Sequence, residues 1–269
     1  MLKTSFHLYP KGKGMRVNGF DLLGDGIFNI DGDGWKFQRQ VSSHEFNTRS
    51  LRKFVEHVVD VELTDRLVPI LASSAATRTT VLDFQDILQR FAFDNICKIA
   101  FGYDPAYLMP SLPEAIFATA FEEAVFITTG RIRTNLPMIW KLKRLLNIGS
   151  EKRLRIAVGV VREFANKVTK EKKLELEQKS SLDSVDLLSR FLSSGHSDEK
   201  FVADIAGPRV CLGKEMAFLQ MKRVVAGVLR RFRVVPAADD LVDPVYVSSF
   251  TAKMKGGFPV RIEVRNEIK

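Results

Sequence analysis

Hydrophobic residues recur along most of the chain at the three- and four-residue spacing of amphipathic helices. In the first long example these positions alternate with Arg and Glu, and the apolar members are Leu51, Val55, Val58, Val59, Leu63 and Leu67. Pro69 falls near the end of this stretch.

A second helix is marked at both of its ends. Asp83 is a residue type that caps helix N-termini, and Gly102 suits the left-handed conformation in which many helices end. Between these two residues, the positions expected to point inward are Ile87, Leu88, Phe91, Ile96 and Ile99.

Two more helices are expected in the middle of the chain. Residues 111–130 are rich in Phe and Ala, and we interpret Phe117, Phe121 and Phe126 as core, with the lining of an apolar ligand pocket as the alternative. Pro137 interrupts the helical pattern. A long helix is then predicted over residues 150–177, and Glu151 in its first turn suits the helix dipole.

The last third of the chain changes in character. Residues 178–200 are rich in Ser and charge and typical of a linker, except for a short apolar helix around 185–192. Residues 234–236 (Val-Val-Pro) are expected to end a helix. Segments 245–247 and 260–264 predict two short strands around the loop 255–257. The pattern as a whole predicts a mainly α protein with a small C-terminal β-hairpin.

Composition places the chain among folded proteins and narrows its chemistry. Of its 269 residues, 45% are hydrophobic and 27% charged, which excludes a disordered or collagen-like chain. The two cysteines, Cys97 and Cys211, exclude a disulfide scaffold and a thiolate-rich structural zinc site. No stretch reaches the roughly 20 apolar residues of a membrane span. Met1–Lys13 carries no apolar segment typical of a signal peptide.

The formal net charge of +9 raises the question of an anionic partner. Basic residues are spread along the chain, and the densest group lies among Leu and Ile at helical spacing: Lys141, Lys143, Arg144, Lys152, Arg153 and Arg155. We interpret this group as the solvated side of amphipathic helices. Attraction to an anionic membrane surface or an acidic protein is the alternative. Nucleic-acid binding would rest on charge alone, and we do not expect it.

The segment 206–215 has the clearest potential for chemistry. Cys211 is expected at the start of a helix, where unpaired N–H groups and the positive dipole end stabilise a thiolate. Gly207 and Gly213 would let a flat ligand approach the backbone, and Arg209 could pair with a carboxylate on that ligand. These properties suit a haem iron with its propionates. The alternative is a small buried cysteine in a glycine-containing turn.

The pattern Gly-x-Arg-x-Cys-x-Gly over residues 207–213 resembles the haem-binding loop of the cytochrome P450 superfamily. Trp35 and Arg39 match the Trp-x-x-x-Arg helix motif of that family. Residues 23–33 look like plant fatty-acid ω-hydroxylases of the superfamily, a branch that also contains hydroxylases of jasmonoyl-isoleucine. Segments 207–231 and 254–260 continue the likeness, which covers nearly the whole chain in order.

This resemblance implies an incomplete cytochrome P450 fold that binds haem b (iron protoporphyrin IX). The implied activity is a monooxygenase that hydroxylates fatty acids or fatty-acid-derived hormone conjugates at or near the ω carbon. The implied haem-binding residues are Trp35, Arg39, Gly207, Arg209, Cys211 and Gly213. Among them Cys211 would be the axial iron ligand, the Trp and the two Arg residues would hold the propionates, and the glycines would give haem access to the loop.

The resemblance also implies partners and a location. An NADPH-dependent cytochrome reductase would supply electrons, docking near Lys214, Lys222 and Arg223. Phe117 and Phe121 would contribute to the wall around a fatty-acyl substrate. Members of the family are held at the endoplasmic reticulum membrane. No anchor is recognisable in this sequence, so a cytosolic location is left open.

The likeness breaks between Ile205 and Ala206. Residues 200–205 look like the entry to the long helix that crosses over the haem, whereas Ala206 already belongs to the cysteine loop. The oxygen-activating Gly-x-Asp/Glu-Thr segment, the Glu-x-x-Arg helix and the Pro-rich meander are therefore expected to be absent, so no catalytic residue is assigned. Residues 1–205 would form the N-terminal helical part, and residues 206–269 the cysteine loop, its following helix and the hairpin.

This break leads to a second hypothesis, in which the protein is not an active enzyme. The chain would then be a catalytically inactive truncated or mis-spliced product that binds haem poorly or not at all. Haem that loses one wall of its pocket is exposed to water, and helices that packed on the missing segments would expose apolar stripes.

The remaining signals are weak. Residues 29–40 imitate the spacing of a calcium loop, but Gln40 replaces the bidentate Glu, so we prefer a turn that precedes the helix of Trp35. The four histidines show no metal-ligand spacing. Cys97 falls on the apolar side of its helix, and we expect it to serve in packing.

Overall fold

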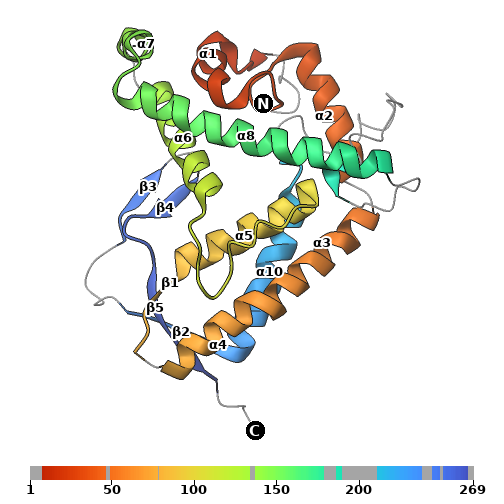
Figure 1. The fold of residues 1–269 in the computed structure, drawn as a ribbon, viewed down its shortest axis with the longest axis vertical. Helices are drawn as coiled ribbons and strands as arrows, with labels where there is room; N and C mark the ends of the chain where they lie inside the picture. The colour runs from red at the N-terminus through yellow and green to blue at the C-terminus, as the bar shows by residue number, and fades with distance from the viewer. Residues whose placement is uncertain are drawn as a thin grey trace. The chain divides into compact units, whose positions relative to one another are not determined.

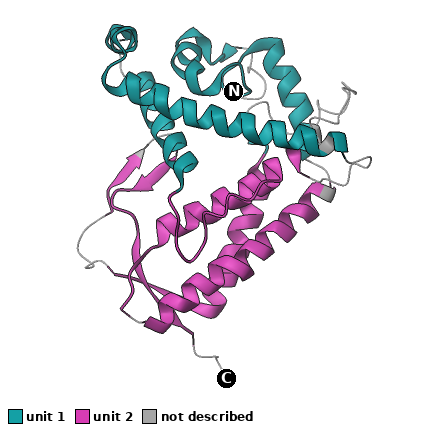
Figure 2. Ribbon diagram, viewed as in Figure 1, with its two compact units in different colours: residues 1–48, 115–182, 189–212 teal, residues 49–114, 183–188, 213–269 magenta. Residues whose placement is uncertain are grey.

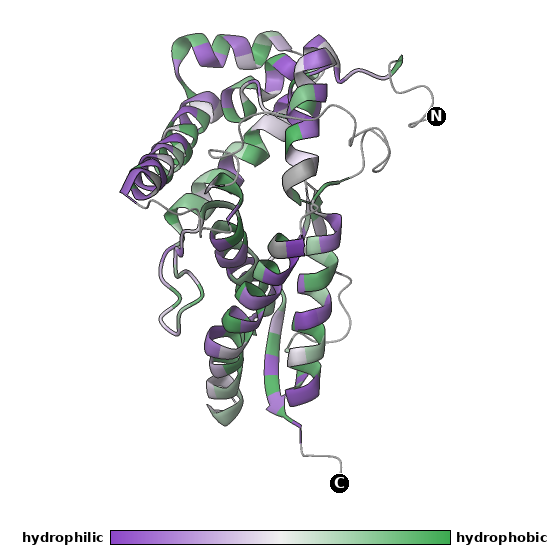
Figure 3. Cartoon of the chain, turned by 90° about the vertical axis from the view of Figure 1, so that its right-hand side faces the viewer, coloured by the Kyte–Doolittle hydropathy of each residue, from purple (hydrophilic) through white to green (hydrophobic). Residues whose placement is uncertain are grey.

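A computed structural model describes residues 8–46, 49–77, 79–133, 137–178, 186–189, 211–237, 244–248 and 251–265 (Figure 1). The chain divides into two compact units that alternate along the sequence (Figure 2). Unit 1 comprises residues 1–48, 115–182 and 189–212, and unit 2 comprises residues 49–114, 183–188 and 213–269. The prediction of a mainly α chain is confirmed. Hydrophobic and hydrophilic stretches share the same helices, as the periodicity predicts (Figure 3).

Unit 1 is helical throughout its described part. Its helices are α1 (Gly12–Leu23), α2 (Gly32–Phe46), α6 (Ile116–Arg133), α7 (Pro137–Leu146) and α8 (Gly149–Gln178). The core lies between α6 and α8, where five buried apolar side chains cluster: Ala124, Ile127, Leu154, Ala157 and Val158. The long helix expected over 150–177 is confirmed as α8.

The aromatic residues of α6 correct one expectation. The helix begins at Ile116 and not near residue 111, because Pro110 and Pro113 disfavour helical backbone before it. Phe121 and Phe126 are exposed at 41% and 53%, so the interpretation of both as core was wrong. The buried face of α6 is offset from them and carries Ala124 and Ile127.

Unit 2 contains α3 (Arg49–Glu62), a π turn η2 (Leu63–Leu67), α4 (Val68–Thr77), α5 (Phe84–Phe101) and α10 (Lys214–Arg231). Helix α3 ends at Glu62, and the helical run continues past Pro69 into α4. The π turn precedes it, with the Val68 N–H donating five residues back to the Leu63 carbonyl. Proline can then sit in the first turn of α4, where its missing N–H costs little.

Helix α5 is capped as the sequence predicts. The Asp83 carboxylate accepts hydrogen bonds from the Gln85 and Asp86 N–H groups, and Gly102 adopts the left-handed conformation with φ 64°. Ile87, Phe91 and Ile99 are buried, but Ile96 is 45% exposed. Ile96 lies nine residues after Ile87, which is two and a half helical turns, so it points to the opposite face.

Two small antiparallel sheets complete unit 2. The first has the order β1-β5-β2, formed by Leu82–Asp83, Pro259–Val264 and Phe232–Pro236. The second is the hairpin of β3 (Tyr246–Ser248) with β4 (Ala252–Met254). Both predicted strands are present, but the hairpin between them was wrong: β3 pairs with β4, and the strand at 260–264 pairs with β1 and β2. Residues 234–236 lie in β2 and do not end a helix, since α10 ends at Arg231.

A network of buried charges joins η2, α5 and the loop after α5. Arg66 contacts Glu62, Asp94 and Asp104, and Lys98 donates to Glu62 at 2.5 Å. The Asp94 carboxylate also accepts from the N–H groups of residues 107 and 108. Because Glu62 and Asp94 are fully buried, burial raises the pKa of each above its ordinary range, although the nearby cations oppose this shift.

The raised pKa of Asp94 gives a pH-dependent prediction. A carboxyl group that binds its proton more tightly in the folded state stabilises the fold below its unfolded pKa of about 4 and loses this contribution as the pH rises through the folded value. The free energy of unfolding of the parent, minus that of Asp94→Asn, should therefore fall from acidic to neutral pH. Urea unfolding at a series of pH values measures this difference. A difference that grows with pH would contradict it.

Candidate functional site

Trp35 and Arg39 lie one helical turn apart on α2. Asp33 is in the first turn of this helix, where a carboxylate suits the helix dipole. The spacing of four residues places both side chains on the same face, and both are half-buried. The structure thus gives the Trp-x-x-x-Arg motif the shared face that a flat, acidic ligand requires.

The loop before α2 is held by an ammonium group. The Lys11 Nζ donates to the carbonyl oxygens of Ile27 and Ile30, each at 2.7 Å. Asp31 accepts from the Gly12 N–H at the start of α1, and Asp33 turns outward to Lys36. Within the described residues, no group of three or more His, Cys, Asp or Glu side chains is arranged to hold a metal ion. This geometry agrees with a structural turn.

Cys211 is a free thiol exposed to solvent, so the buried-cysteine alternative is wrong for this residue. It lies two residues before Gly213, the N-cap of α10, whose carbonyl accepts the Ala217 N–H at 2.9 Å and closes the first helical turn. Gly207 and Arg209 lie outside the described residues. The cysteine is thus available to a ligand beside the positive end of an 18-residue helix.

Arg39 and Cys211 are close enough to interact electrostatically. Burial lowers the pKa of the Arg39 guanidinium, and a thiolate charge on Cys211 raises it. The two residues are 172 positions apart in sequence (211 minus 39), and both belong to unit 1. The structure therefore brings together two of the predicted haem-binding residues, one from each side of the break at Ile205.

The face of α10 carries an uncovered apolar stripe. Its exposed members share an arc of less than a third of the helix circumference, and they are Phe218, Met221, Val225 and Leu229. No segment in the described part of the chain covers them. This exposure agrees with the expectation that helices which packed on the missing segments would show apolar stripes.

The opposite side of α10 packs on α3 and η2. Gly227 allows this approach, since a Cβ there would lie 2.5 Å from Leu63 Cδ2. Arg223 donates to both carboxylate oxygens of Asp60, at 2.7 and 2.6 Å. Arg223 thus has an acidic partner within unit 2, whereas Lys214 and Lys222 are exposed.

Two further residues from the sequence analysis, Phe117 and Cys97, pack against neighbours within their own units. Phe117 stacks on Phe121 and packs on Phe164 of α8, with ring centroids 6.0 and 4.3 Å apart. These contacts form an aromatic group between α6 and α8. Cys97 is buried, and burial raises the pKa of its thiol to about 12, so its predicted packing role is consistent with its environment.

Comparison with known proteins identifies the family. The cytochrome P450 family model matches residues 9–205 and 188–256. Cytochrome P450 94A2 of Vicia sativa is 41% identical over 100% of this chain and 80% of its own length. Cytochrome P450 94B3 of Arabidopsis thaliana is 31% identical over 100% of this chain and 81% of its own length. The chain therefore belongs to the cytochrome P450 family, whose members are haem-dependent monooxygenases.

Solved structures agree on the fold. A mutant cytochrome P450DA heme domain gives a TM-score of 0.63 at 12% identity, covering 96% of this chain and 83% of that chain. A second cytochrome P450, CYP102L1, gives a TM-score of 0.53 at 15% identity, covering 79% of this chain and 44% of that chain. Both similarities support the incomplete cytochrome P450 fold predicted from sequence.

The length of the sequence alignments agrees with an internal break. The alignment with the Vicia protein runs over 414 positions, although this chain has 269 residues. The relative therefore carries a long segment with no counterpart here. The first stretch matched by the family model ends at residue 205, the last residue before the predicted deletion.

Proposed function

We propose that this chain derives from a haem-thiolate hydroxylase of fatty acids, or of fatty-acid-derived hormone conjugates, acting at or near the ω carbon. The observation that carries this proposal is the exposed Cys211 thiol lying within electrostatic reach of Arg39. The relationship to the cytochrome P450 94 proteins and the ω-hydroxylase-like residues 23–33 support the substrate class.

The residues that the structure describes fit one side of a haem group. Cys211 would ligate the iron, and Trp35 and Arg39, on one face of α2, would donate to the propionates together with Arg209. Gly207 and Gly213 would leave the backbone open to the ring. Bound haem would supply the activation of O2 for insertion into a C–H bond. Phe117 and Phe121 would offer an apolar surface to the acyl chain.

An acidic reductase surface would meet the basic residues around α10. Lys214 and Lys222 are exposed there, while Arg223 is already paired with Asp60. We therefore assign the two lysines, and not Arg223, to the reductase contact. The family places such enzymes at the endoplasmic reticulum membrane. Among the helices described, none has both the length and the apolarity to cross a bilayer.

A second candidate is a non-catalytic product that does not retain haem. The uncovered stripe on α10 and the long gap in the alignments favour it. Haem with one face in water binds weakly, and water reaches the site where O2 would react. Amplifying cDNA across the Ile205–Ala206 junction shows whether the cell makes this message or one that contains the missing segment.

The reduced carbon-monoxide difference spectrum of the purified full chain, expressed with excess haem, tests the proposal. A Soret band of the thiolate type would show haem ligation, and turnover of lauric acid with NADPH and the reductase would then establish the activity. Our expectation for this chain is weak haem retention and no measurable turnover, because the oxygen-activating segment is absent. Turnover would overturn that expectation, and a complete lack of haem would favour the second candidate.

A further inference from the structure

The uncovered stripe on α10 has an unpaired charge near each of its ends. Its members, each 45–55% exposed, are Phe218, Met221, Val225 and Leu229. Glu215 lies in the first turn of the helix and Arg230 in the last, and both are exposed. In the part of the chain that the structure describes, neither side chain forms an ion pair. A partner that covers the stripe would therefore meet a carboxylate at one end and a guanidinium group at the other.

Glu215 and Arg230 lie on the same flank of the stripe. A groove of about 610 Å³ runs along this flank between α10 and α3, and Glu215, Lys222 and Arg230 line it. The α3 side of the groove also carries both signs of charge, from Arg52 and Glu56. A uniformly acidic or basic partner would place like charges together here. The groove therefore suits a partner surface of mixed charge, and a second copy of this chain provides one.

An antiparallel pair of α10 helices would align the apolar stripe with itself. A twofold axis close to position 223 sets Met221 opposite the partner's Val225, and Phe218 opposite the partner's Leu229. Each apolar side chain then packs on another, which removes the stripes of both copies from water.

The same arrangement pairs the charges. A twofold axis across the two helices keeps each flank on its own side, so Glu215 comes to lie beside the partner's Arg230, and this contact forms twice in a dimer. A parallel pair would align the stripe equally well. It would, however, set Glu215 against the partner's Glu215 and Arg230 against the partner's Arg230. The charges thus favour antiparallel packing.

We propose that this chain forms a homodimer through α10, with the two helices antiparallel and Glu215 of each copy paired with the partner's Arg230. The net charge of +9 on each copy opposes association, so the dimer needs this local complementarity as well as the apolar stripe. Lys214 and Lys222 are exposed on the same helix, and the dimer would compete with the reductase contact proposed above. The inference does not rest on haem binding.

Sedimentation equilibrium of the purified full chain, over a range of concentrations, measures the dimer. Leu229→Asp should raise the dissociation constant by about tenfold or more, because it places a carboxylate in the apolar interface of both copies. Leu145→Asp on α7 is the matched control, since Leu145 is an even more exposed leucine, at 82%, and belongs to unit 1. This control should leave the dissociation constant unchanged.

Charge reversal tests the register of the two helices. Glu215→Arg alone and Arg230→Glu alone should each raise the dissociation constant by about tenfold, because each creates two contacts between like charges. The double variant Glu215→Arg/Arg230→Glu should return to within about threefold of the parent. Fifteen residues of helix, about 22 Å, separate the two positions within one copy, so this recovery requires contact between copies.

Circular dichroism of every variant checks that the helices persist. The double variant opposes the dipole of α10 at both ends, so an effect on the helix alone would make it the weakest dimer of the series. The proposal is overturned if Leu145→Asp weakens the dimer as much as Leu229→Asp, or if the double variant does not recover. A parent chain that stays monomeric also overturns it. If that monomer sediments with dodecyl maltoside micelles, the stripe binds an amphiphile and not a second copy.

Discussion

Replacing Cys211 by Ser should abolish any thiolate-type Soret band that the carbon-monoxide difference spectrum shows for the parent chain. A serine hydroxyl is not deprotonated at neutral pH and does not give the electronic signature of iron–thiolate ligation. The expected loss is complete, since Cys211 is one of only two cysteines and the other is buried. The measurement is the same spectrum at equal protein and haem concentrations.

Cys97→Ala is the control for this prediction. The Cys97 thiol is enclosed within unit 2, and its pKa is raised to about 12 by burial, so it cannot supply a thiolate ligand. The band should survive this substitution with an unchanged position. A band that persists in Cys211→Ser but disappears in Cys97→Ala would reverse the assignment of the axial ligand.

Arg131→Ala should lower the free energy of unfolding by about 3–5 kcal/mol, because it leaves a buried carboxylate without its partner. Arg131 is 4% exposed, forms a bidentate contact with Glu151, which is equally buried, and also donates to Asp21 and the Asn18 carbonyl. Its guanidinium lies 4.5 Å from the centroid of the Trp140 ring. Urea unfolding followed by far-UV circular dichroism measures the loss.

Two further variants test whether that loss of stability comes from the unpaired buried charge. Arg153→Ala, on the same helix pair, removes an exposed ion pair with Glu123 and should cost less than about 1 kcal/mol. The double variant Arg131→Met/Glu151→Leu removes both buried charges and should recover most of the stability. If Arg131→Ala and Arg153→Ala cost the same, the buried pair does not hold unit 1 together.

The helices were predictable where their signals are local. The capping residues Asp83 and Gly102 and the apolar repeat of α5 lie within 20 residues of one another, so the sequence alone defines the element. The π turn before Pro69 and the strand β2 were not predictable in this way. The first depends on how a proline is accommodated within a continuing helix, and the second on pairing with β5 far along the chain.

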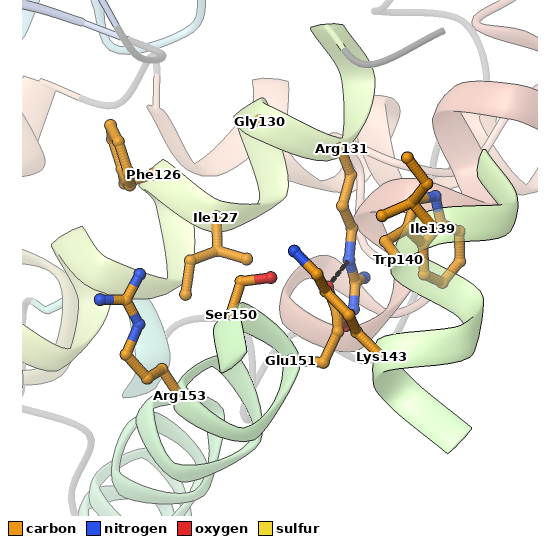
Figure 4. Close-up of a pocket in the computed structure, with 10 residues that line it drawn as sticks. All are labelled: Phe126, Ile127, Gly130, Arg131, Ile139, Trp140, Lys143, Ser150, Glu151 and Arg153. Carbon is orange, nitrogen blue, oxygen red and sulfur yellow. Dashed lines mark hydrogen bonds and ion pairs between the residues drawn. The ribbon is translucent and has the colours of Figure 1, made fainter. Parts of the chain in front are cut away.

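The candidate site shows the same contrast between local and long-range signals. Fixed motif spacings mark Cys211, Trp35 and Arg39 as candidates, and the structure places Arg39 within electrostatic reach of Cys211. Phe121 and Phe126 were misjudged because hydrophobicity does not reveal which side of a helix is covered. The cavity of about 210 Å³ that Arg131, Ile139 and Lys143 line was missed altogether (Figure 4). Arg131 is held there by Asp21, which lies 110 residues away and shares no local pattern with it.

The three-stranded sheet has a consequence for how the protein is made. β5 supplies the central strand, and the Phe258 N–H donates to Asp83 across 175 residues. A ribosome must therefore synthesise the chain as far as β5 before this sheet can assemble, whereas α3 to α5 are made earlier. Closing so long a loop adds little to the equilibrium cost, which grows only with the logarithm of loop length, but it delays the final step. Unit 2 is therefore completed only once β5 is available, and until then the residues that pair with it remain open to other contacts.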